Sequence, residues 1–308
     1  MRAVLVVNPN ATTTSERGRD VLVRALRSEV DLRVEYTRRR GHASALAQQA
    51  SRAGVDVVVT LGGDGTVNEA VNGMMACGNS AEERPALAVV PGGSTNVFAR
   101  ALGLPKDWAE GTGVILEALR EGRTRTIGLG RADERYFTFC AGLGLDAQVV
   151  HRVERARLRG KKSTAWLYLR STFGQYFLET ERRHPPVTLE RPGEPEEHGL
   201  ATVIIQNTAP WTYLGDRAVN PCPDACFDTG LDLLAMRELR VPSTIRTVRQ
   251  MLSRSPKPHG RRVLSLHDQS NFTLSATSPM SFQLDGDYLG ERHKVEFAAV
   301  PRALRVAC

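Results

Sequence analysis

The sequence predicts an α/β domain built on a parallel sheet, followed by a β-sandwich domain. In the first third of the 308 residues, short β-branched runs alternate with helical patterns, and glycine-rich turns follow two of the strand-like runs. From about residue 124, strand-like runs with polar breaks predominate. Alternating strands and helices indicate a parallel sheet, whereas successive strands are typical of a sandwich. We therefore expect an α/β domain over 1–126 and a β-sandwich over 127–308, whose last residues can return to the first domain.

The elements of the first domain follow from hydrophobic periodicity. Val21, Leu22, Ala25 and Leu26 recur at helical spacing, while the strand-like runs are short, apolar and rich in valine. Glycine and proline end several of these runs. Strands are expected at 3–7, 32–36, 56–61 and 86–90, and helices at 15–29, 42–53, 68–75 and 97–102.

The second domain is expected to consist mainly of strands. Strands are expected at 136–139, 201–205, 231–234 and 272–274. Between them, residues 149–183 resemble a helical insertion rich in Arg and Lys, and residues 185–199 are expected to form a loop because Pro, Glu and Gly predominate there.

Charge and cysteine content restrict the class of partner and the compartment. The net charge of +7 and the pI near 9.4 favour an anionic partner, whether nucleotide, nucleic acid or lipid. Five scattered cysteines, an odd number, argue against a disulfide framework and for a reducing, cytoplasmic location. No apolar run approaches the roughly 20 residues of a membrane span, so membrane contact is expected to be peripheral.

The segment Leu61-Gly-Gly-Asp-Gly-Thr-Val-Asn-Glu69 is the most informative, because it lies where a buried strand turns into a helix. Its glycines allow close backbone approach, so amides near the positive end of the helix can point at phosphate oxygens. Asp64 would repel phosphate unless Mg²⁺ or water lies between them. A tight turn with a helix cap is the alternative interpretation of a single glycine-rich loop.

Two further polar loops favour a binding site. Pro91-Gly-Gly-Ser-Thr-Asn96 again follows a buried strand, and Asn8 to Thr12 follows the first strand. Because the carboxyl ends of parallel strands meet at one edge of a sheet, we expect the three loops to converge there.

This combination of motifs resembles the diacylglycerol kinase family, which also includes sphingosine and ceramide kinases. The GGDGT element alone is shared with NAD kinases and phosphofructokinases, whereas the ordered set of loops is more specific. The sequence departs from the family pattern at Thr12, where glycine is usual, and at Val97, where Asp is common.

The resemblance implies an ATP-dependent lipid kinase in which ATP and the acceptor lipid meet in a cleft between the two domains. The acceptor it favours is diacylglycerol, giving phosphatidic acid, with sphingosine, ceramide or NAD as alternatives. The implied ATP-site residues are Asn8, Pro9, Asn10, Ala11, Thr12, Thr37, Gly62, Gly63, Asp64, Gly65, Thr66, Val67, Asn68, Glu69, Ser94, Thr95 and Asn96.

Leu284-Asp-Gly-Asp-Tyr-Leu289 matches an acidic family element. It makes Asp287 the expected general base, because phosphoryl transfer from ATP needs a carboxylate near the attacking hydroxyl. Asp285 and Asp64 complete the expected catalytic set. Read without the family, Asp-Gly is first a hairpin turn. Asp146 can face the cleft or lie in a surface hairpin.

Mg²⁺ is expected to arrive with ATP, with Asp64 as a candidate partner. The loop Cys226 to Leu231 resembles a structural magnesium loop of some family members, but the usual Asp aligns with Thr229, which leaves Asp228 as its candidate ligand.

The segment 152–162 is rich in Arg and Lys and suits docking on an anionic membrane surface, although a solvated helix face has the same composition. Family members often pair as homodimers. A nucleic-acid-binding function has only the net charge in its favour, because no recognisable binding motif is present. A catalytically inactive relative is disfavoured by the presence of Asp64 and Asp287.

Overall fold

The structure, a computed structural model, describes residues 1–11, 14–78, 80–144, 147–148 and 186–308. The chain divides into two compact units. Unit 1 comprises residues 1–129 and 301–308, and unit 2 comprises residues 130–300. Within the described residues, no helix combines the length and apolar character of a membrane span.

Several predictions concern residues outside the described ranges. They are those made for Thr12, for Asp146, for the insertion at 149–183 and for the basic segment 152–162 within it.

Unit 1 contains a parallel sheet in the order β2–β1–β3–β4, with the end of β16 beside β4. Every residue of β3 and β4 is buried, as their apolar sequences predicted. The strand order reverses direction between β1 and β3, which makes that position the topological switch point. The strands are β1 (Arg2–Val7), β2 (Asp31–Tyr36), β3 (Val57–Gly62), β4 (Ala86–Pro91) and the last residues of β16 (Asp287–Ala307).

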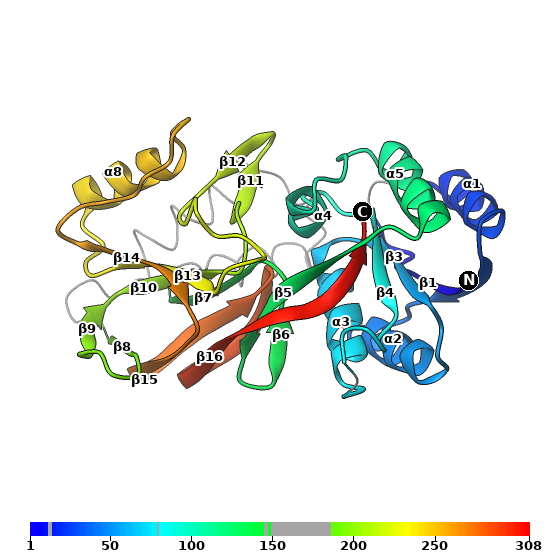
Figure 1. The fold of residues 1–308 in the computed structure, drawn as a ribbon. Coiled ribbons are helices and arrows are strands. Elements are labelled where there is room, and N and C mark those ends of the chain that lie inside the picture. Colours follow the sequence, from blue (N-terminus) through cyan, green and yellow to red (C-terminus); the bar gives the residue numbers. More distant parts are fainter. Residues whose placement is uncertain (12–13, 79, 145–146, 149–185) are drawn as a thin grey trace. The chain divides into compact units, whose positions relative to one another are not determined.

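Helices cover both faces of this sheet (Figure 1). Leu22 and Leu26 of α1 and Ile115 of α5 share one core with Leu5 and Val59 of the strands. On the other face α2 and α3 pack closely, since a Cβ at Gly73 would lie 2.1 Å from the carbonyl oxygen of Ser44. The helices are α1 (Glu16–Arg27), α2 (His42–Arg52), α3 (Asp64–Met75), α4 (Val97–Ala101) and α5 (Trp108–Glu121).

Unit 2 is mostly antiparallel, in the order β14–β13–β10–β7–β15–β16, with β8 and β9 joined through β15. Its strands are β5 (Thr124–Ala132), which begins in unit 1, β6 (Arg135–Phe137), β7 (Cys140–Gly144), β8 (Val187–Glu190), β9 (Glu197–Leu200), β10 (Thr202–Gln206), β11 (Thr212–Leu214), β12 (Arg217–Val219), β13 (Leu231–Met236), β14 (Val263–Gln269), β15 (Asn271–Leu284) and the rest of β16.

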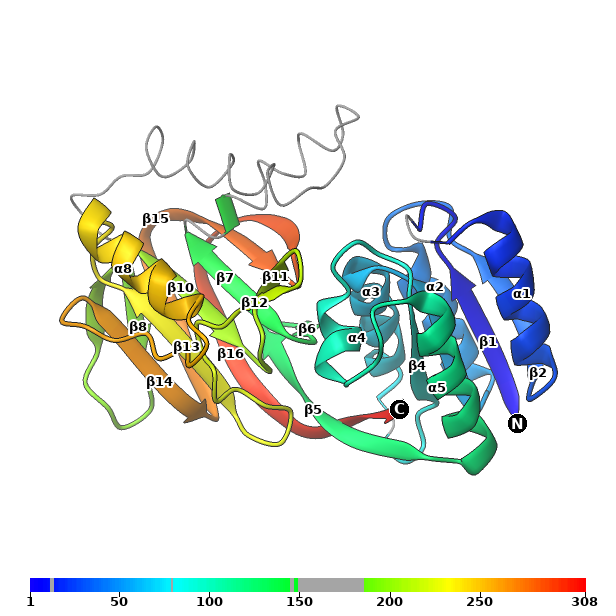
Figure 2. The same ribbon diagram turned by 90° about the horizontal axis from the view of Figure 1, so that it is seen from above.

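Side chains in unit 2 alternate between two environments. Val203 and Ile205 of β10 enter the main core, whereas Ile204 between them points to the opposite face. There it meets Met251 of the helix α8 (Val241–Met251), which lies over the strands in Figure 2. This period of two is the strand pattern expected for a sheet buried on both sides.

Three sequence expectations need correction. Residues 185–199 are not one loop, because Val187 and Leu189 alternate into the core and form β8, which pairs with β9. The run 136–139 is not one strand, since Thr138 and Phe139 separate β6 from β7. Helix α3 begins at Asp64 rather than Asn68, because Gly63 is extended and serves as its N-cap.

Candidate functional site

The three polar turns of unit 1 converge at the carboxyl edge of the sheet, as expected. The Asn8 amide donates to Leu61 O at 2.9 Å, and the Gly92 amide donates to Gly62 O at 2.8 Å. The Asn8 side-chain amide donates to the Thr66 hydroxyl at 3.1 Å. These contacts bring the turns together at the switch point, where sheets of this kind bind ligands.

Glycine is required where the turns after β3 and β4 touch. A Cβ at Gly93 would lie 2.6 Å from the Cα of Gly63, and one at Gly92 would lie 2.9 Å from the Gly62 amide nitrogen. A Cβ at Gly62 would lie 2.5 Å from the Thr66 hydroxyl. Backbone therefore packs directly on backbone where Gly92 and Gly93 meet Gly62 and Gly63.

Helix α3 starts at this edge, with Asp64, Gly65 and Thr66 in its first turn. The first amides of a helix have no partner within the helix, and the helix dipole adds positive potential. An anion such as a nucleotide phosphate is favoured at such a position. Because α3 already begins at Asp64, the GGDGT segment is a short turn followed by a helix, not an extended loop.

The carboxylate of Asp64 contacts the next turn. Its two oxygens accept hydrogen bonds from the backbone amides of Val97 and Phe98, both at 3.0 Å. These amides belong to the first turn of α4, so Asp64 fixes the start of that helix. A carboxylate oxygen has a second lone pair, and Asp64 is only partly buried, so it can also accept from a water on a bound cation.

Glu69 holds a neighbouring helix. Its carboxylate accepts from the amides of Gly41 at 2.7 Å and Ala43 at 3.1 Å, at the start of α2. A negative charge at a helix N-terminus is stabilising. Asn68 is fully buried, and Asn72 donates to its backbone and side-chain oxygens. Glu69 and Asn68 therefore support the carboxyl edge of the sheet from within helix α3.

The remaining predicted ATP-site residues surround the edge. Pro9, Asn10 and Ser94 are exposed, whereas Val67 is buried. Thr37 follows β2, and its amide donates to Val7 O at 2.8 Å. Ala11 and Thr95 are half-buried.

Asn96 closes the turn after β4. It adopts a positive φ of 51°, and its side chain exchanges two hydrogen bonds of 2.8 Å with the backbone of Gly93. Its amide group is thus committed to shaping the turn.

In unit 2, Asp285 is buried and fully engaged with the backbone. One oxygen accepts from the amide and hydroxyl of Thr138 at 2.7 and 2.8 Å, and the other accepts from Phe139 and Cys140 amides at 3.0 and 3.1 Å. Thr138 and Phe139 form the break between β6 and β7, and Cys140 is the first residue of β7. The carboxylate thus supplies acceptors for the amides at this break.

Asp285 and Gly286 form the two-residue turn of a hairpin. Both have positive φ, 48° and 80°, which is the type I′ geometry that favours Asp-Gly. Asp287 follows as the first residue of β16, paired with Leu284. It is partly exposed, and the Arg135 guanidinium lies 3.9 Å from its carboxylate.

Two residues that support this turn were not predicted from the sequence. The side-chain oxygen Oε1 of Gln283 accepts from the Gly286 amide at 2.9 Å, and the Asn207 side chain donates to Thr138 O at 2.9 Å. Both are buried polar residues: Gln283 lies within the apolar end of β15, and Asn207 directly follows the apolar strand β10. That pattern is the sequence signal that would have identified them, because a buried amide needs partners.

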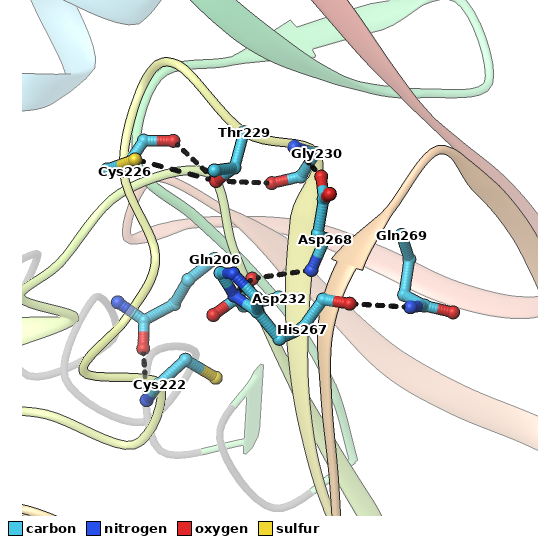
Figure 3. A network of polar contacts seen from close by, with 9 residues as sticks. All are labelled: Gln206, Cys222, Cys226, Thr229, Gly230, Asp232, His267, Asp268 and Gln269. Atoms are coloured by element: carbon cyan, nitrogen blue, oxygen red, sulfur yellow. Dashed lines mark hydrogen bonds and ion pairs between the residues drawn. The ribbon is translucent and has the colours of Figure 1, made fainter.

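The loop Cys226 to Leu231, which resembles a structural magnesium loop, is held by its own hydrogen bonds. Figure 3 shows the Thr229 hydroxyl placed against the carbonyl oxygens of Cys226 and Gly230, at 3.1 and 3.4 Å. Asp228 is exposed. Among the residues that the structure describes, no group of three or more His, Cys, Asp or Glu side chains is arranged to hold a metal ion.

Comparison with known proteins places these features in a family. Residues 2–132 match the model described as the diacylglycerol kinase catalytic domain. A diacylglycerol kinase of Staphylococcus aureus (strain bovine RF122 / ET3-1) is 33% identical over 301 residues, which cover 94% of this chain and 87% of that protein. A diacylglycerol kinase of Bacillus subtilis (strain 168) is 28% identical, over 81% of this chain and 77% of its own length.

Two other matches differ in extent. A probable lipid kinase YegS-like protein of Chromohalobacter salexigens is 41% identical over 120 residues, covering 39% of this chain and 37% of that protein. The crystal structure of a diacylglycerol kinase from Bacillus anthracis str. Sterne has a TM-score of 0.75 at 21% identity, over 99% of this chain and 96% of that one. The latter likeness shows the fold.

Together with the glycine-lined edge, these matches make the protein a lipid phosphotransferase that uses ATP. More narrowly, the chain belongs to the diacylglycerol kinase family, because its similarity to the S. aureus relative extends over nearly its whole length.

Proposed function

We propose that the protein transfers the γ-phosphate of ATP to the free hydroxyl of diacylglycerol, forming phosphatidic acid. The observation that carries the ATP half is the convergence of three turns at the switch point, where Gly62 and Gly92 are in direct backbone contact. Diacylglycerol is favoured as the acceptor because two relatives matched over most of the chain carry that name.

We assign ATP binding to the turns around Asn8, Gly63 and Gly93, together with the first turn of α3. Backbone amides there would receive the phosphates, and the Thr66 hydroxyl, oriented by Asn8, lies beside them. Glu69 and Asn96 act indirectly, because their side chains hold the start of α2 and the turn after β4 in place. The buried Asn68 side chain accepts from Asn72 within α3.

Asp287 is proposed as the general base. Its carboxylate would accept the proton of the lipid hydroxyl while the hydroxyl oxygen forms a bond to the γ-phosphorus. The bond from that phosphorus to the β–γ bridging oxygen breaks, and ADP leaves. Asp285 is a positioning residue, since its oxygens are occupied by the 138–140 backbone.

Magnesium bound with ATP would neutralise phosphate charge, and Asp64 is the residue whose geometry suits it, as an acceptor from a metal-bound water. We do not extend the proposal to a structural ion near Asp228, because the Thr229 hydroxyl already contacts the carbonyl oxygens of that loop. From the sequence alone, we also propose that residues 152–162 contact an anionic membrane surface and that two copies of the chain pair.

The test is phosphate transfer from γ-labelled ATP with Mg²⁺ to mixed micelles that hold diacylglycerol, sphingosine or ceramide in turn, with NAD as a soluble control. Labelled phosphatidic acid is the expected product. Labelled sphingosine phosphate or ceramide phosphate alone would move the acceptor to another lipid. Labelled NADP would reject the lipid acceptor.

The role of Asp287 is tested separately. Asp287→Asn should lower kcat by roughly 10²–10⁴-fold, the contribution typical of a general base, while ATP binding measured by calorimetry is retained. Unchanged kcat would remove Asp287 from the mechanism.

A further inference from the structure

Helix α8 presents an apolar stripe to solvent instead of to the core. Its buried residues are Thr247 and Met251, while Ile245 is 55% exposed and Val248 is 43% exposed. A helix on the surface of a globular protein normally turns its large aliphatic side chains inward. The opposite side of α8 does pack on the sheet, because Met251 shares a core cluster with Ile204 and Leu234.

The same side of α8 is basic. A surface hollow runs along the helix at positions spaced by three and four residues, so its lining side chains share one side of α8. The lining residues are Pro242, Ile245, Arg246, Arg249, Gln250 and Ser253. Arg246 and Arg249 are exposed, and in the described part of the chain no carboxylate lies within ion-pair distance of either.

The surrounding sequence extends this charge. Residues 239–262 contain seven Arg or Lys and no Asp or Glu. In this stretch, Arg240 and Arg262 share an ion pair with the single Glu238 carboxylate, at 2.7 and 3.0 Å. The charge of the remaining five is available to an external partner with negative charge.

The C-terminal end of α8 is hydrogen-bonded to the neighbouring β11–β12 segment. The Asn220 amide donates to Met251 O at 3.1 Å, and the Arg217 side chain donates to Leu252 O. Arg217 is the first residue of β12, and Asn220 follows its last residue. The hairpin of β11 and β12 shares a core cluster with the end of α8.

We infer that this α8 face, defined as Pro242, Ile245, Arg246, Val248 and Arg249, docks on an anionic lipid bilayer. Aliphatic side chains flanked by arginines on one helix side suit insertion at the head-group boundary, with the guanidinium groups beside lipid phosphates. The inference rests on the proposed function only in that a lipid acceptor is reached at a bilayer surface. It concerns a different segment of the chain from residues 152–162.

The test is cosedimentation of the full chain with vesicles, without ATP. We expect binding to vesicles of equal parts phosphatidylcholine and phosphatidylglycerol, and much weaker binding to phosphatidylcholine alone. Arg246→Gln with Arg249→Gln should weaken binding about thirty-fold, about fivefold for each charge at low salt. Ile245→Ser with Val248→Ser should weaken it at least about tenfold.

Helix α1 offers matched controls. Arg24 and Arg27 are exposed with the same spacing of three residues, and Val21 is 60% exposed. Arg24→Gln with Arg27→Gln, and Val21→Ser, should leave vesicle binding unchanged. Equal losses in the α1 and α8 variants would show a diffuse charge effect and overturn the assignment.

Two further readouts separate this inference from the proposed function. Transfer of phosphate to a short-chain, monomeric diacylglycerol should be the same in wild type and both α8 variants. Absence of transfer in every form would reject the proposed function but not the docking face. Sedimentation equilibrium tests the other occupant: α8 variants that bind vesicles normally but convert a dimer to monomers would assign the face to a second copy and overturn the inference.

Discussion

The carboxylate of Asp285 accepts hydrogen bonds from both the amide and the hydroxyl of Thr138, at 2.7 and 2.8 Å. The two residues are far apart in the sequence, and their contact ties the Asp-Gly turn to the break between β6 and β7. Because Asp287 follows that turn directly, the position of its side chain depends on this contact. Two acidic residues of one short motif therefore have different tasks, one structural and one proposed as chemical.

Asp285→Ala should lower the free energy of unfolding of unit 2 by roughly 3 kcal/mol, because it leaves the buried amides of residues 138–140 without their acceptors. Asp285→Asn should cost less, since the amide group retains one acceptor oxygen. Urea unfolding followed by circular dichroism measures both.

Asp287→Asn is the matched control for this effect. Asp287 is partly exposed, so its loss should change stability by no more than about 0.5 kcal/mol. Equal destabilisation by Asp285→Asn and Asp287→Asn would mean that the turn is not held by Asp285.

Gly93→Ala should separate the turns after β3 and β4. The added Cβ would lie 2.6 Å from the Cα of Gly63. Because this neighbour is a backbone atom, the clash can be relieved only by a shift of the backbone. We expect at least about tenfold weaker ATP binding, together with a loss of roughly 1–3 kcal/mol in stability from overpacking. Isothermal calorimetry with ATP and Mg²⁺ measures the first quantity.

Gly113→Ala controls for the chemistry of the substitution. Gly113 lies inside α5, and nothing stands within 4 Å of an added Cβ there. Stability should rise by up to about 1 kcal/mol, because alanine is the better helix former, and ATP binding should not change. If Gly93→Ala also left ATP binding intact, the glycine-lined edge would not be the nucleotide site.

Glu69→Gln should weaken the start of α2. The carboxylate that accepts from Gly41 and Ala43 carries a charge that also favours the helix dipole, so its neutralisation should cost about 1 kcal/mol. The KM for ATP should change little if Glu69 acts only as this support. A large rise in KM with unchanged stability would instead make Glu69 a direct ATP ligand.

The fold of unit 1 was largely predictable because its signals are local. Continuous apolar runs identified β3 and β4, and the spacing of Leu22 and Leu26 identified α1. Helix α8 was not predicted, since Ile245 and Val248 point outward and its inward side includes Thr247. Sequence periodicity identifies a helix by aliphatic residues that face the core, so it does not identify a helix whose large aliphatic residues face outward.

The convergence of the polar turns could be predicted because parallel strands end at one edge. The tasks of individual side chains could not. Asp64, Glu69 and Asp285 are all acidic residues of glycine-containing motifs, yet each accepts hydrogen bonds from backbone amides of a segment distant in sequence. Such pairings depend on which elements become neighbours after folding, and one sequence carries no local signal for them.

His267 should make the stability of unit 2 depend on pH. Its ring nitrogen lies 2.8 Å from the buried Asp232 carboxylate, and this hydrogen bond raises the pKa of His267 above its ordinary 6.5, with Asp224 and Asp268 adding to the effect (Figure 3). A raised pKa in the folded state means that the charged pair stabilises fully below pH 6.5 and that this stabilisation is lost as the pH rises through the higher value. The melting temperature of wild type should therefore exceed that of His267→Gln by more at about pH 6 than at about pH 9. Asp232→Asn should abolish the pH dependence of this difference, and an equal difference at both pH values in the wild-type background would refute the pairing.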